Sequence, residues 1–255
     1  MPKQTKHLVF LLGGLGSTKI TFRPMVADLE ASGFQPIVVD TSTVSSNDER
    51  VVALRNTIRN IFIEKNGENF AIIGQSAGGL AALRFAQAEY KDPHLRALVL
   101  CSPAIPRLKR FPLLFATPTL MWVLLKYLPQ ILSRRNIKFN PIDLRRLNSP
   151  LLCGMGRMCE LLANSGRIPA LEARELAFYP PKLTNRFPTC PLTLVRGEED
   201  KWIRNAINKK FFNLLQNSWG SHNVVWLTSG GGHLVLEDKM IRKSIIWRLQ
   251  EAFHF

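Results

Sequence analysis

Short runs of apolar residues recur along the chain and alternate with stretches in which apolar residues recur every three or four positions. The runs Leu8 to Leu12 and Leu95 to Cys101 are typical of strands that are buried on both faces. Helical spacing appears between such runs, for example from Arg23 to Ala31, where Gly33 ends the pattern. Strands that alternate with helices in this way predict a parallel sheet covered by helices.

The same alternation extends over most of the chain. Strands are expected at Leu8 to Leu12, Pro36 to Asp40, Asn69 to Gly74, Leu95 to Cys101, Pro191 to Arg196 and Val224 to Leu227. Helices are expected at Arg23 to Ala31, Asp48 to Ile63, Ala77 to Tyr90, Trp202 to Leu215 and Leu236 to Phe253. The predicted fold class is therefore α/β, with a mostly parallel sheet flanked by helices.

The alternation breaks between Ala104 and Pro188, where prolines are frequent and no strand-like run occurs. The beginning of this segment, Phe111 to Leu132, is apolar and nearly long enough for a transmembrane helix. Three prolines and Lys126 interrupt it, so we expect two short helices packed over an apolar surface instead.

The residues around Ser76 match the pattern G-x-S-x-G between a predicted strand and a predicted helix. A serine in such a turn is held in a strained backbone conformation, so the residues two before and two after it have to be small. Here they are Gly74 and Gly78. The N–H group of Ala77 and the positive end of the following helix face the place where an oxyanion would develop. The alternative is a glycine-rich turn with an ordinary serine, since the motif also occurs by chance.

A second glycine-rich loop, Gly13-Gly14-Leu15-Gly16-Ser17, follows the first strand. The N–H group of Leu15 is the natural second donor to an oxyanion, beside that of Ala77. A phosphate-binding loop is the alternative, but the third glycine of a dinucleotide fingerprint and the Gly-Lys-Ser/Thr of a P-loop are both missing.

Two further strand ends carry residues that a serine nucleophile requires, namely a base and an acid that orients it. Of the five histidines, only His233 follows a core strand in a glycine-rich turn. The acid candidates Glu198, Glu199 and Asp200 follow the preceding strand. In an open parallel sheet, the carboxyl ends of the strands form the edge where ligands bind, and Ser76 is expected at that edge too.

Together, these pieces resemble the α/β-hydrolase superfamily, and within it the branch of monoacylglycerol lipases and small carboxylesterases. The matching segments are Gly74 to Gly78, Leu98 to Pro103, Arg196 to Asp200 and Gly232 to Asp238. The resemblance implies Asp200 as the acid, because in that family it lies three residues past the glycine that ends its strand, and His233 as the base. It also implies a core of residues 1–103 and 189–255 with a helical cap inserted at 104–188.

The resemblance implies a serine hydrolase that cleaves carboxylic esters with lipid-like or long acyl groups and needs neither cofactor nor metal. Ser76 attacks the carbonyl, His233 transfers the proton, Asp200 orients His233, and the N–H groups of Leu15 and Ala77 hold the oxyanion. From the apolar run in the cap, we expect Trp122 and Leu125 to bind the acyl chain. A thioesterase or acyltransferase with the same triad, or a noncatalytic binding protein with this fold, remains an alternative.

The composition fits one globular domain of 255 residues. The four cysteines are too few and too scattered for a disulfide framework, and Cys153 and Cys159 have no histidine or second cysteine pair near them to complete a zinc site. The apolar run near the N-terminus is too short for a signal peptide and is needed as the first strand. A reducing compartment, the cytoplasm, is therefore expected.

The net charge of +15 first suggests a nucleic-acid-binding protein, but the core carries no recognisable binding motif. Residues 104–188 hold fourteen basic against four acidic residues, so ten of the fifteen net charges lie there. Basic residues flank the apolar run of this segment on both sides (Arg107, Lys109, Arg110, Arg134 and Arg135). This arrangement predicts contact with an anionic membrane surface. A solvated basic face is the alternative.

Overall fold

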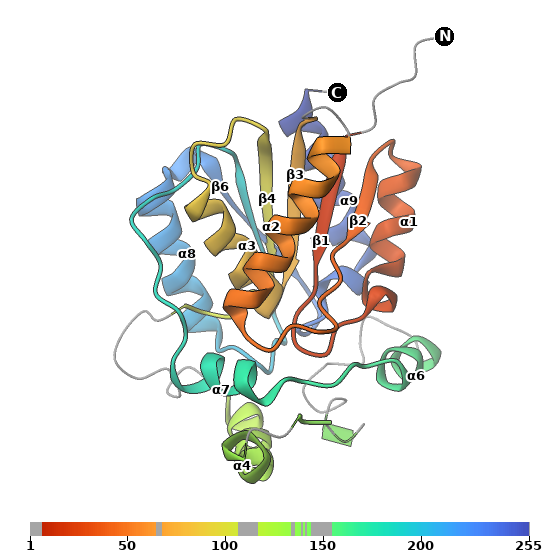
Figure 1. Ribbon diagram of the computed structural model, residues 1–255, viewed down its shortest axis with the longest axis vertical. Coiled ribbons are helices and arrows are strands. Elements are labelled where there is room, and N and C mark those ends of the chain that lie inside the picture. The colour runs from red at the N-terminus through yellow and green to blue at the C-terminus, as the bar shows by residue number, and fades with distance from the viewer. Residues whose placement is uncertain are drawn as a thin grey trace.

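A computed structural model describes residues 7–64, 68–106, 117–133, 136–138, 140, 142–143 and 155–254 of the chain. These residues form one sheet of six parallel strands in the order β2-β1-β3-β4-β5-β6 (Figure 1). The strands are β1 (Leu8–Leu12), β2 (Gln35–Val38), β3 (Phe70–Gln75), β4 (Leu95–Cys101), β5 (Leu192–Gly197) and β6 (Val224–Ser229). The predicted fold class is confirmed, although β2 ends at Val38 and leaves Val39 and Asp40 in the following loop.

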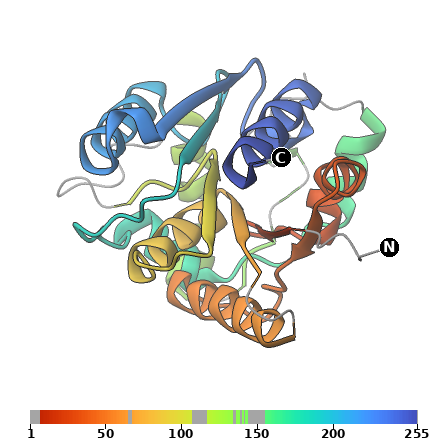
Figure 2. The same ribbon diagram turned by 90° about the horizontal axis from the view of Figure 1, so that it is seen from above.

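Helices cover both faces of the sheet (Figures 1 and 2). One face is covered by α2 (Asn47–Glu64), α3 (Ala77–Ala88) and α8 (Asn205–Trp219), and the other by α1 (Arg23–Ala31) and α9 (Lys239–Phe253). Alternate residues of one strand point to opposite faces, so Phe10 packs in the cluster with α2 and α3 whereas Leu11 packs in the cluster with α1 and α9. Every residue of β1 and β3 is buried, which explains their continuous apolar sequences.

Two helices begin later than their apolar spacing predicts, and in each case an aspartate that precedes the helix accepts hydrogen bonds from backbone N–H groups. Asp200 accepts hydrogen bonds from the N–H groups of Trp202 and Ile203, so this stretch forms a turn and α8 begins only at Asn205. Asp238 caps α9 by accepting from the N–H groups of the second and third helical residues, and a short 3-10 turn precedes it. Helix α3 also ends two residues earlier than predicted, at Ala88.

The segment between β4 and β5, which we call the insertion (residues 104–188), adds no described strand to the sheet. Its helices α4 (Pro118–Leu132), α6 (Met155–Ala163) and α7 (Ala170–Phe178) lie at the end of the molecule where the strands end (Figure 1). A single helix over Pro118–Leu132 corrects the expectation of two short helices there, while residues 111–116 lie outside the described part. Proline at 118 is tolerated in the first helical turn, and Pro129 lies so near the end that only one turn follows it. None of the described helices is long and apolar enough to cross a membrane.

The insertion has a small apolar cluster of its own. Val123, Tyr127 and Ile131 from one face of α4 pack against Ile137 and Ile168. The backbones of the last two residues pair through hydrogen bonds of 2.8 and 2.9 Å between N–H and carbonyl groups. Leu15 and Trp202 of the sheet-bearing part pack against this cluster, so the insertion meets the loops that follow β1 and β5.

Candidate active site

Ser76 lies between β3 and α3 in a backbone conformation that non-glycine residues rarely adopt. Its φ and ψ angles are 55° and −123°, and such a conformation costs about 1–3 kcal/mol. The tight turn is possible because Gly74 and Gly78, two residues before and after Ser76, lack side chains. A Cβ atom on Gly78 would lie 2.2 Å from the carbonyl oxygen of Leu12, which is far inside van der Waals contact. The sequence G-x-S-x-G is therefore needed by the geometry of the turn.

Asp200 and His233 meet at the ends of β5 and β6. The Nδ1 atom of His233 lies 3.0 Å from Oδ2 of Asp200, and both side chains are buried. The other carboxylate oxygen, Oδ1, accepts hydrogen bonds from the backbone of Trp202 at 2.8 Å and Ile203 at 3.2 Å. Since Asp200 is fixed from one side, its second oxygen can orient the imidazole. Glu198 and Glu199 are exposed instead.

Backbone hydrogen bonds tie the loop that carries Asp200 to the loop that carries His233. The N–H group of Glu198 donates to the carbonyl of Ser229 at 2.9 Å, and that of Glu199 donates to Gly231 at 3.0 Å. The Ser229 hydroxyl in turn donates to the carboxylate of Asp238, the residue that caps α9. The distance between Asp200 and His233 is therefore set by main-chain hydrogen bonds.

The Nε2 atom of His233 is buried and has no hydrogen-bond partner among the described residues. This atom belongs to a ring that lines a cavity of about 90 Å³ together with Ser76. The cavity is lined by Gly14, Leu15, Gly16, Ser17, Thr21, Gln75, Ser76, Leu161, Ser165, Ile168, Trp202, His233 and Leu234. Nucleophile and base candidates thus face one space, with an imidazole nitrogen free to exchange a proton there.

Trp202 and Gln75 are cavity residues that the sequence did not reveal. The indole of Trp202 stacks on the imidazole of His233, with 5.1 Å between ring centroids and 27° between planes. The Oε1 atom of Gln75 is buried and has no hydrogen-bond partner in the part of the chain that the structure describes, so it offers an acceptor beside Ser76. The only sequence signal for Trp202 is its position two residues after the acid, in the turn that Asp200 stabilises.

The glycine-rich loop after β1 lies against Ser76. A Cβ atom on Gly14 would lie 2.6 Å from Cβ of Ser76 and 3.1 Å from its Oγ, so only glycine allows this approach. Leu15 follows in the cavity wall, and Ala77 begins α3 on the other side of the serine. The structure therefore brings both oxyanion candidates next to Ser76.

Trp122 and Leu125, by contrast, are not among the described residues that line this cavity. Both lie on α4 with side chains 46% and 62% exposed. The opposite face of the helix, which includes Val123 and Tyr127, is the buried one. As acyl-chain contacts, Trp122 and Leu125 remain a prediction.

A buried ion pair connects the insertion to the loop after β1. The Arg50 guanidinium of α2 donates to both carboxylate oxygens of Glu172 on α7, at 2.8 and 2.6 Å, and also to the carbonyl of Gly13 at 2.8 Å. The two charged side chains are 2% and 0% exposed. Bidentate pairing of this kind fixes orientation as well as distance, so Glu172 holds the loop next to Ser76 through Arg50.

A second contact of α7 reaches the start of α3. Glu175 accepts a hydrogen bond of 2.9 Å from the backbone N–H of Asn47, and the Asn47 side chain donates to the carbonyl of Ala77 at 3.1 Å. Burial raises the pKa of the Glu175 carboxyl, and the hydrogen bond from Asn47 opposes this effect. Both candidate oxyanion segments are therefore linked to α7 through polar contacts.

Cys101 ends β4 directly beside the turn that holds Ser76, and its carbonyl accepts a hydrogen bond of 3.0 Å from the Ser76 N–H. Complete burial raises the pKa of the Cys101 thiol far above its usual range, so the thiol stays protonated at neutral pH. Cys101 is therefore a packing residue beside the candidate nucleophile. Among the described residues, no three His, Cys, Asp or Glu side chains lie together in a way that could hold a metal ion.

Comparison with known proteins agrees with this architecture. The model of a family described as "Alpha/beta hydrolase family" matches residues 8–242. No curated protein matches the sequence significantly. A soluble variant of monoglyceride lipase from Saccharomyces cerevisiae, solved with a substrate analog, superposes with a TM-score of 0.75 at 16% identity, covering 98% of this chain and 88% of the other.

Two further solved structures have the same fold. A lipase-esterase related protein from Clostridium acetobutylicum gives a TM-score of 0.68 at 14% identity, with 97% of this chain and 95% of the other covered. Tomato methylketone synthase I, complexed with 2-tridecanone, gives a TM-score of 0.64 at 14% identity, covering 97% of this chain and 99% of the other. At these identities the similarity establishes the fold and leaves the reaction to the chemistry of the site.

Proposed function

The chain belongs to the α/β-hydrolase family, and on that basis we propose that it is a serine hydrolase that cleaves carboxylic esters. Ser76 is the nucleophile, His233 the general base and acid, and Asp200 the residue that orients His233. The observation that carries the proposal is the free Nε2 atom of His233, in a ring held by Asp200 on its other nitrogen and facing the same cavity as Ser76.

The reaction proceeds in two halves. His233 accepts the Ser76 proton as Oγ attacks the ester carbonyl, then donates it to the leaving alcohol, which leaves an acyl group on Ser76. Water, deprotonated by the same nitrogen, releases the acid. The N–H groups of Leu15 and Ala77 stabilise the oxyanion in both halves, with help from the N-terminus of α3. No metal or cofactor takes part.

The test is ester turnover in a matched set of variants. Wild-type protein is assayed with p-nitrophenyl esters from acetate to palmitate, and Ser76→Ala and His233→Ala are each expected to lose turnover by about 10³-fold or more. The double variant is expected to be hardly worse than either single one, since triad members act as a unit. A fluorophosphonate probe should label wild type and not Ser76→Ala. Turnover by Ser76→Ala at the wild-type rate would refute the proposal.

The proposed substrate is an ester with a long or lipid-like acyl group, and the insertion serves as the cap over it. Leu161 and Ile168 of the insertion, together with Leu234, give the Ser76 cavity an apolar wall. The similar structures include a monoglyceride lipase and a protein with bound 2-tridecanone, which supports an apolar chain as ligand.

Truncation of the apolar wall tests the acyl-chain proposal. Ile168→Ala should shift the preference among p-nitrophenyl esters, with a larger loss for palmitate than for acetate, because Ile168 is buried against the cavity. Leu171→Ala is the matched control, since Leu171 is exposed on α7. An equal loss for all chain lengths would show that the insertion does not select the acyl group.

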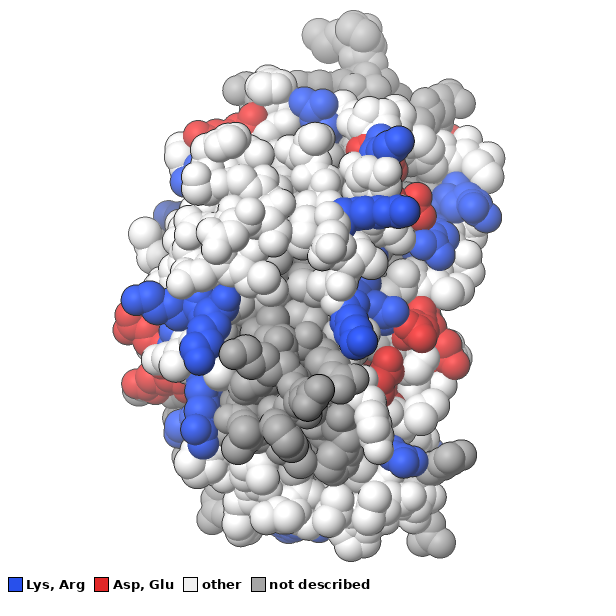
Figure 3. All heavy atoms as spheres, turned by 90° about the vertical axis from the view of Figure 1, so that its left-hand side faces the viewer, with Lys and Arg blue, Asp and Glu red and all other residues white. Residues whose placement is uncertain are grey.

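We further propose that the protein meets its substrate at an anionic membrane surface on the cytoplasmic side. Trp122, Leu125 and Leu132 lie exposed on one face of α4, at the outer end of the insertion (Figure 1). On a neighbouring side of the molecule, lysine and arginine side chains lie in separate groups at mid-height, with acidic side chains beside them (Figure 3). The basic residues that flank the apolar run in sequence, from Arg107 to Arg110 and at 134–135, lie outside the described residues. The described cysteines are free thiols, which supports a reducing compartment.

Cosedimentation with vesicles tests this second proposal. Binding is expected to vesicles that contain anionic lipid, to be lost at high salt, and to be absent with purely zwitterionic vesicles. Trp122→Ser should weaken binding, whereas Trp247→Ser, which changes an exposed tryptophan on α9, should not. Equal binding of both kinds of vesicle, or of neither, would refute the proposal.

A further inference from the structure

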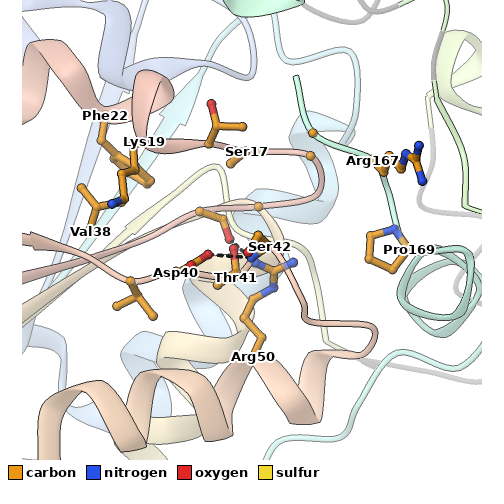
Figure 4. Close-up of a pocket in the computed structure, with 16 residues that line it drawn as sticks. Ser17, Lys19, Phe22, Val38, Asp40, Thr41, Ser42, Arg50, Arg167 and Pro169 are labelled. Atoms are coloured by element: carbon orange, nitrogen blue, oxygen red, sulfur yellow. Dashed lines mark hydrogen bonds between the residues drawn. The ribbon is translucent and has the colours of Figure 1, made fainter. Parts of the chain in front are cut away.

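A second cavity, of about 400 Å³, opens beside the loop after β1 (Figure 4). Its walls come from four parts of the chain: the loops after β1 and β2, the Arg50 side chain of α2, and residues 166–169 of the insertion. Gly14, Gly16 and Ser17 line both this cavity and the Ser76 cavity. The two spaces therefore adjoin at these three small residues.

The Ser76 cavity, at about 90 Å³, is much smaller than its neighbour. Beyond the reacting carbonyl, the rest of the substrate has to extend outward. The 400 Å³ cavity, which shares Gly16 and Ser17 with the Ser76 cavity, offers the space for one portion of it.

The chemical character of the larger cavity differs from that of the Ser76 cavity. Ser17, Thr41 and Ser42 contribute hydroxyl groups, and the side chains of Lys19 and Arg167 stand on opposite sides of the space (Figure 4). Neither Lys19 nor Arg167 forms a salt bridge with a carboxylate of the described residues, and both side chains are exposed. Two cations without a salt-bridge partner among the described residues therefore line a polar space beside Ser76.

The remaining charges around this cavity already have partners. Glu172 neutralises Arg50 through two hydrogen bonds. Asp40 accepts a hydrogen bond of 2.9 Å from the Ser42 N–H, and the bonds from Ser42, with a smaller contribution from Lys19, lower the pKa of Asp40. Asp40 thus stays ionised and offsets part of the positive charge on the side of Lys19. The unbalanced positive charge lies toward Arg167.

We propose that this cavity binds the polar portion of the ester and selects one that carries an anionic group, a carboxylate or a phosphate, between Lys19 and Arg167. The inference rests on the proposed function, since it assigns the second half of the same substrate. The apolar acyl chain occupies the side of Ser76 lined by Leu161 and Ile168. Arg167 can donate two parallel hydrogen bonds to an oxyanion, whereas Lys19 acts as a point charge.

Three esters with the same butyryl group test the proposal: methyl 4-(butyryloxy)benzoate, which is neutral, its free acid, and 4-(butyryloxy)phenyl phosphate. We expect wild type to have a higher kcat/KM for at least one anionic ester than for the neutral one, with the preference reduced by added salt. The larger of the two anionic preferences identifies the group that the site accepts. Equal kcat/KM for all three esters would overturn the proposal.

Charge-removing variants locate the preference. Arg167→Gln and Lys19→Gln should each reduce the ratio of anionic to neutral kcat/KM by about 1.5-fold to fivefold, the range of an exposed charge contact. Lys182→Gln is the matched control, because Lys182 is an exposed cation of the insertion that does not line the cavity. A ratio that falls as much in Lys182→Gln as in Arg167→Gln would reduce the preference to general net charge and overturn the proposal.

A binding measurement separates failure of this inference from failure of the proposed function. Saturation-transfer NMR with 4-hydroxybenzoate and its methyl ester, the two leaving groups, requires no catalysis. Stronger binding of the anion to wild type than to Arg167→Gln supports the site even if no ester is cleaved. Turnover of the neutral ester that depends on Ser76, combined with equal binding of both phenols, would retain the hydrolase and reject the site.

Discussion

The sheet-bearing core and the insertion are held by different kinds of interaction. In the core, apolar clusters lie on both faces of the sheet, and their members pack through continuous buried surface. The described part of the insertion has a small apolar cluster, on which Leu15 and Trp202 of the core pack, and it also meets the core through charged pairs such as Arg50 with Glu172 and Arg157 with Glu237. Apolar burial stabilises without fixing direction, whereas a bidentate ion pair specifies an orientation. The core therefore supplies stability, and the charged pairs set where the insertion stands relative to Ser76.

The largest expected loss of stability comes from removing one partner of the buried ion pair between Arg50 and Glu172. Glu172→Leu leaves the Arg50 guanidinium buried without its carboxylate, and we expect the free energy of unfolding to fall by about 3–5 kcal/mol. Arg50→Met combined with Glu172→Leu should recover most of this loss, because no charge then remains buried. Urea unfolding of the wild type, both single variants and the double variant gives the coupling energy.

The double variant also separates positioning from stability. If Arg50 holds the loop after β1 through the Gly13 carbonyl, ester turnover stays reduced in the double variant although its stability returns. A double variant as unstable as Glu172→Leu would show that the two charges do not act as a pair.

Trp202 lies at the junction of the two regions, and its loss should have the next largest effect. Trp202→Leu removes the stacking on His233, which for an aromatic pair is worth about 0.5–1.5 kcal/mol, so we expect a decrease in kcat of up to about tenfold. Trp202→Phe should restore part of the rate by stacking again. Steady-state kinetics of the three proteins test this role, and an unchanged kcat in Trp202→Leu would exclude it.

A smaller effect is expected for the partly exposed network around Arg157. This residue of α6 donates to Glu237 in the core and to Glu160, and Arg157→Gln should cost about 0.5–1 kcal/mol at low salt and less at 1 M NaCl. Ile72→Val, in the middle of β3, should cost about 0.5–1.5 kcal/mol at either salt concentration. If the loss of unfolding free energy depended on salt equally in Arg157→Gln and Ile72→Val, the distinction between core and insertion would be contradicted.

The smallest effects concern two glutamates of the insertion whose pKa values shift in opposite directions. Burial raises the pKa of Glu175 above its ordinary value of 4.5, so its favourable contribution is present below pH 4.5 and is lost as pH rises through its folded pKa. The hydrogen bond from Arg157 lowers the pKa of Glu160, so its contribution is present above pH 4.5 and is lost as pH falls.

Urea unfolding between pH 3.5 and about pH 7, a range that spans the ordinary carboxyl values, tests these signs. Relative to wild type, Glu175→Gln should become more stable as pH rises, and Glu160→Gln should become less stable. The same trend in both variants would show that the two carboxyl groups are not held differently.

Much of the core could be predicted because its signals are local. β1 and β4 begin and end where their apolar runs do, since nearly all residues of a strand buried on both faces have to be apolar. Ser76 could be identified as the candidate nucleophile because its turn has no room for a Cβ atom on Gly78. This requirement leaves the pattern G-x-S-x-G in five consecutive residues. The starts of α8 and α9 were misplaced because they depend on where the side chains of Asp200 and Asp238 form hydrogen bonds.

From the sequence we could predict the class of fold, the strands whose ends carry polar residues, and Ser76 as the candidate nucleophile. Each of these depends on residues that are close together in the chain. Tertiary structure alone decided which of many charges pair. Arg50 and Glu172 lie 122 positions apart, and nothing in their neighbourhoods distinguishes them from the other charged residues. The stacking of Trp202 on His233 and the cavity between Lys19 and Arg167 likewise join segments that only the folded sheet brings together. A charge acts through distance and burial, and both exist only once the chain is folded.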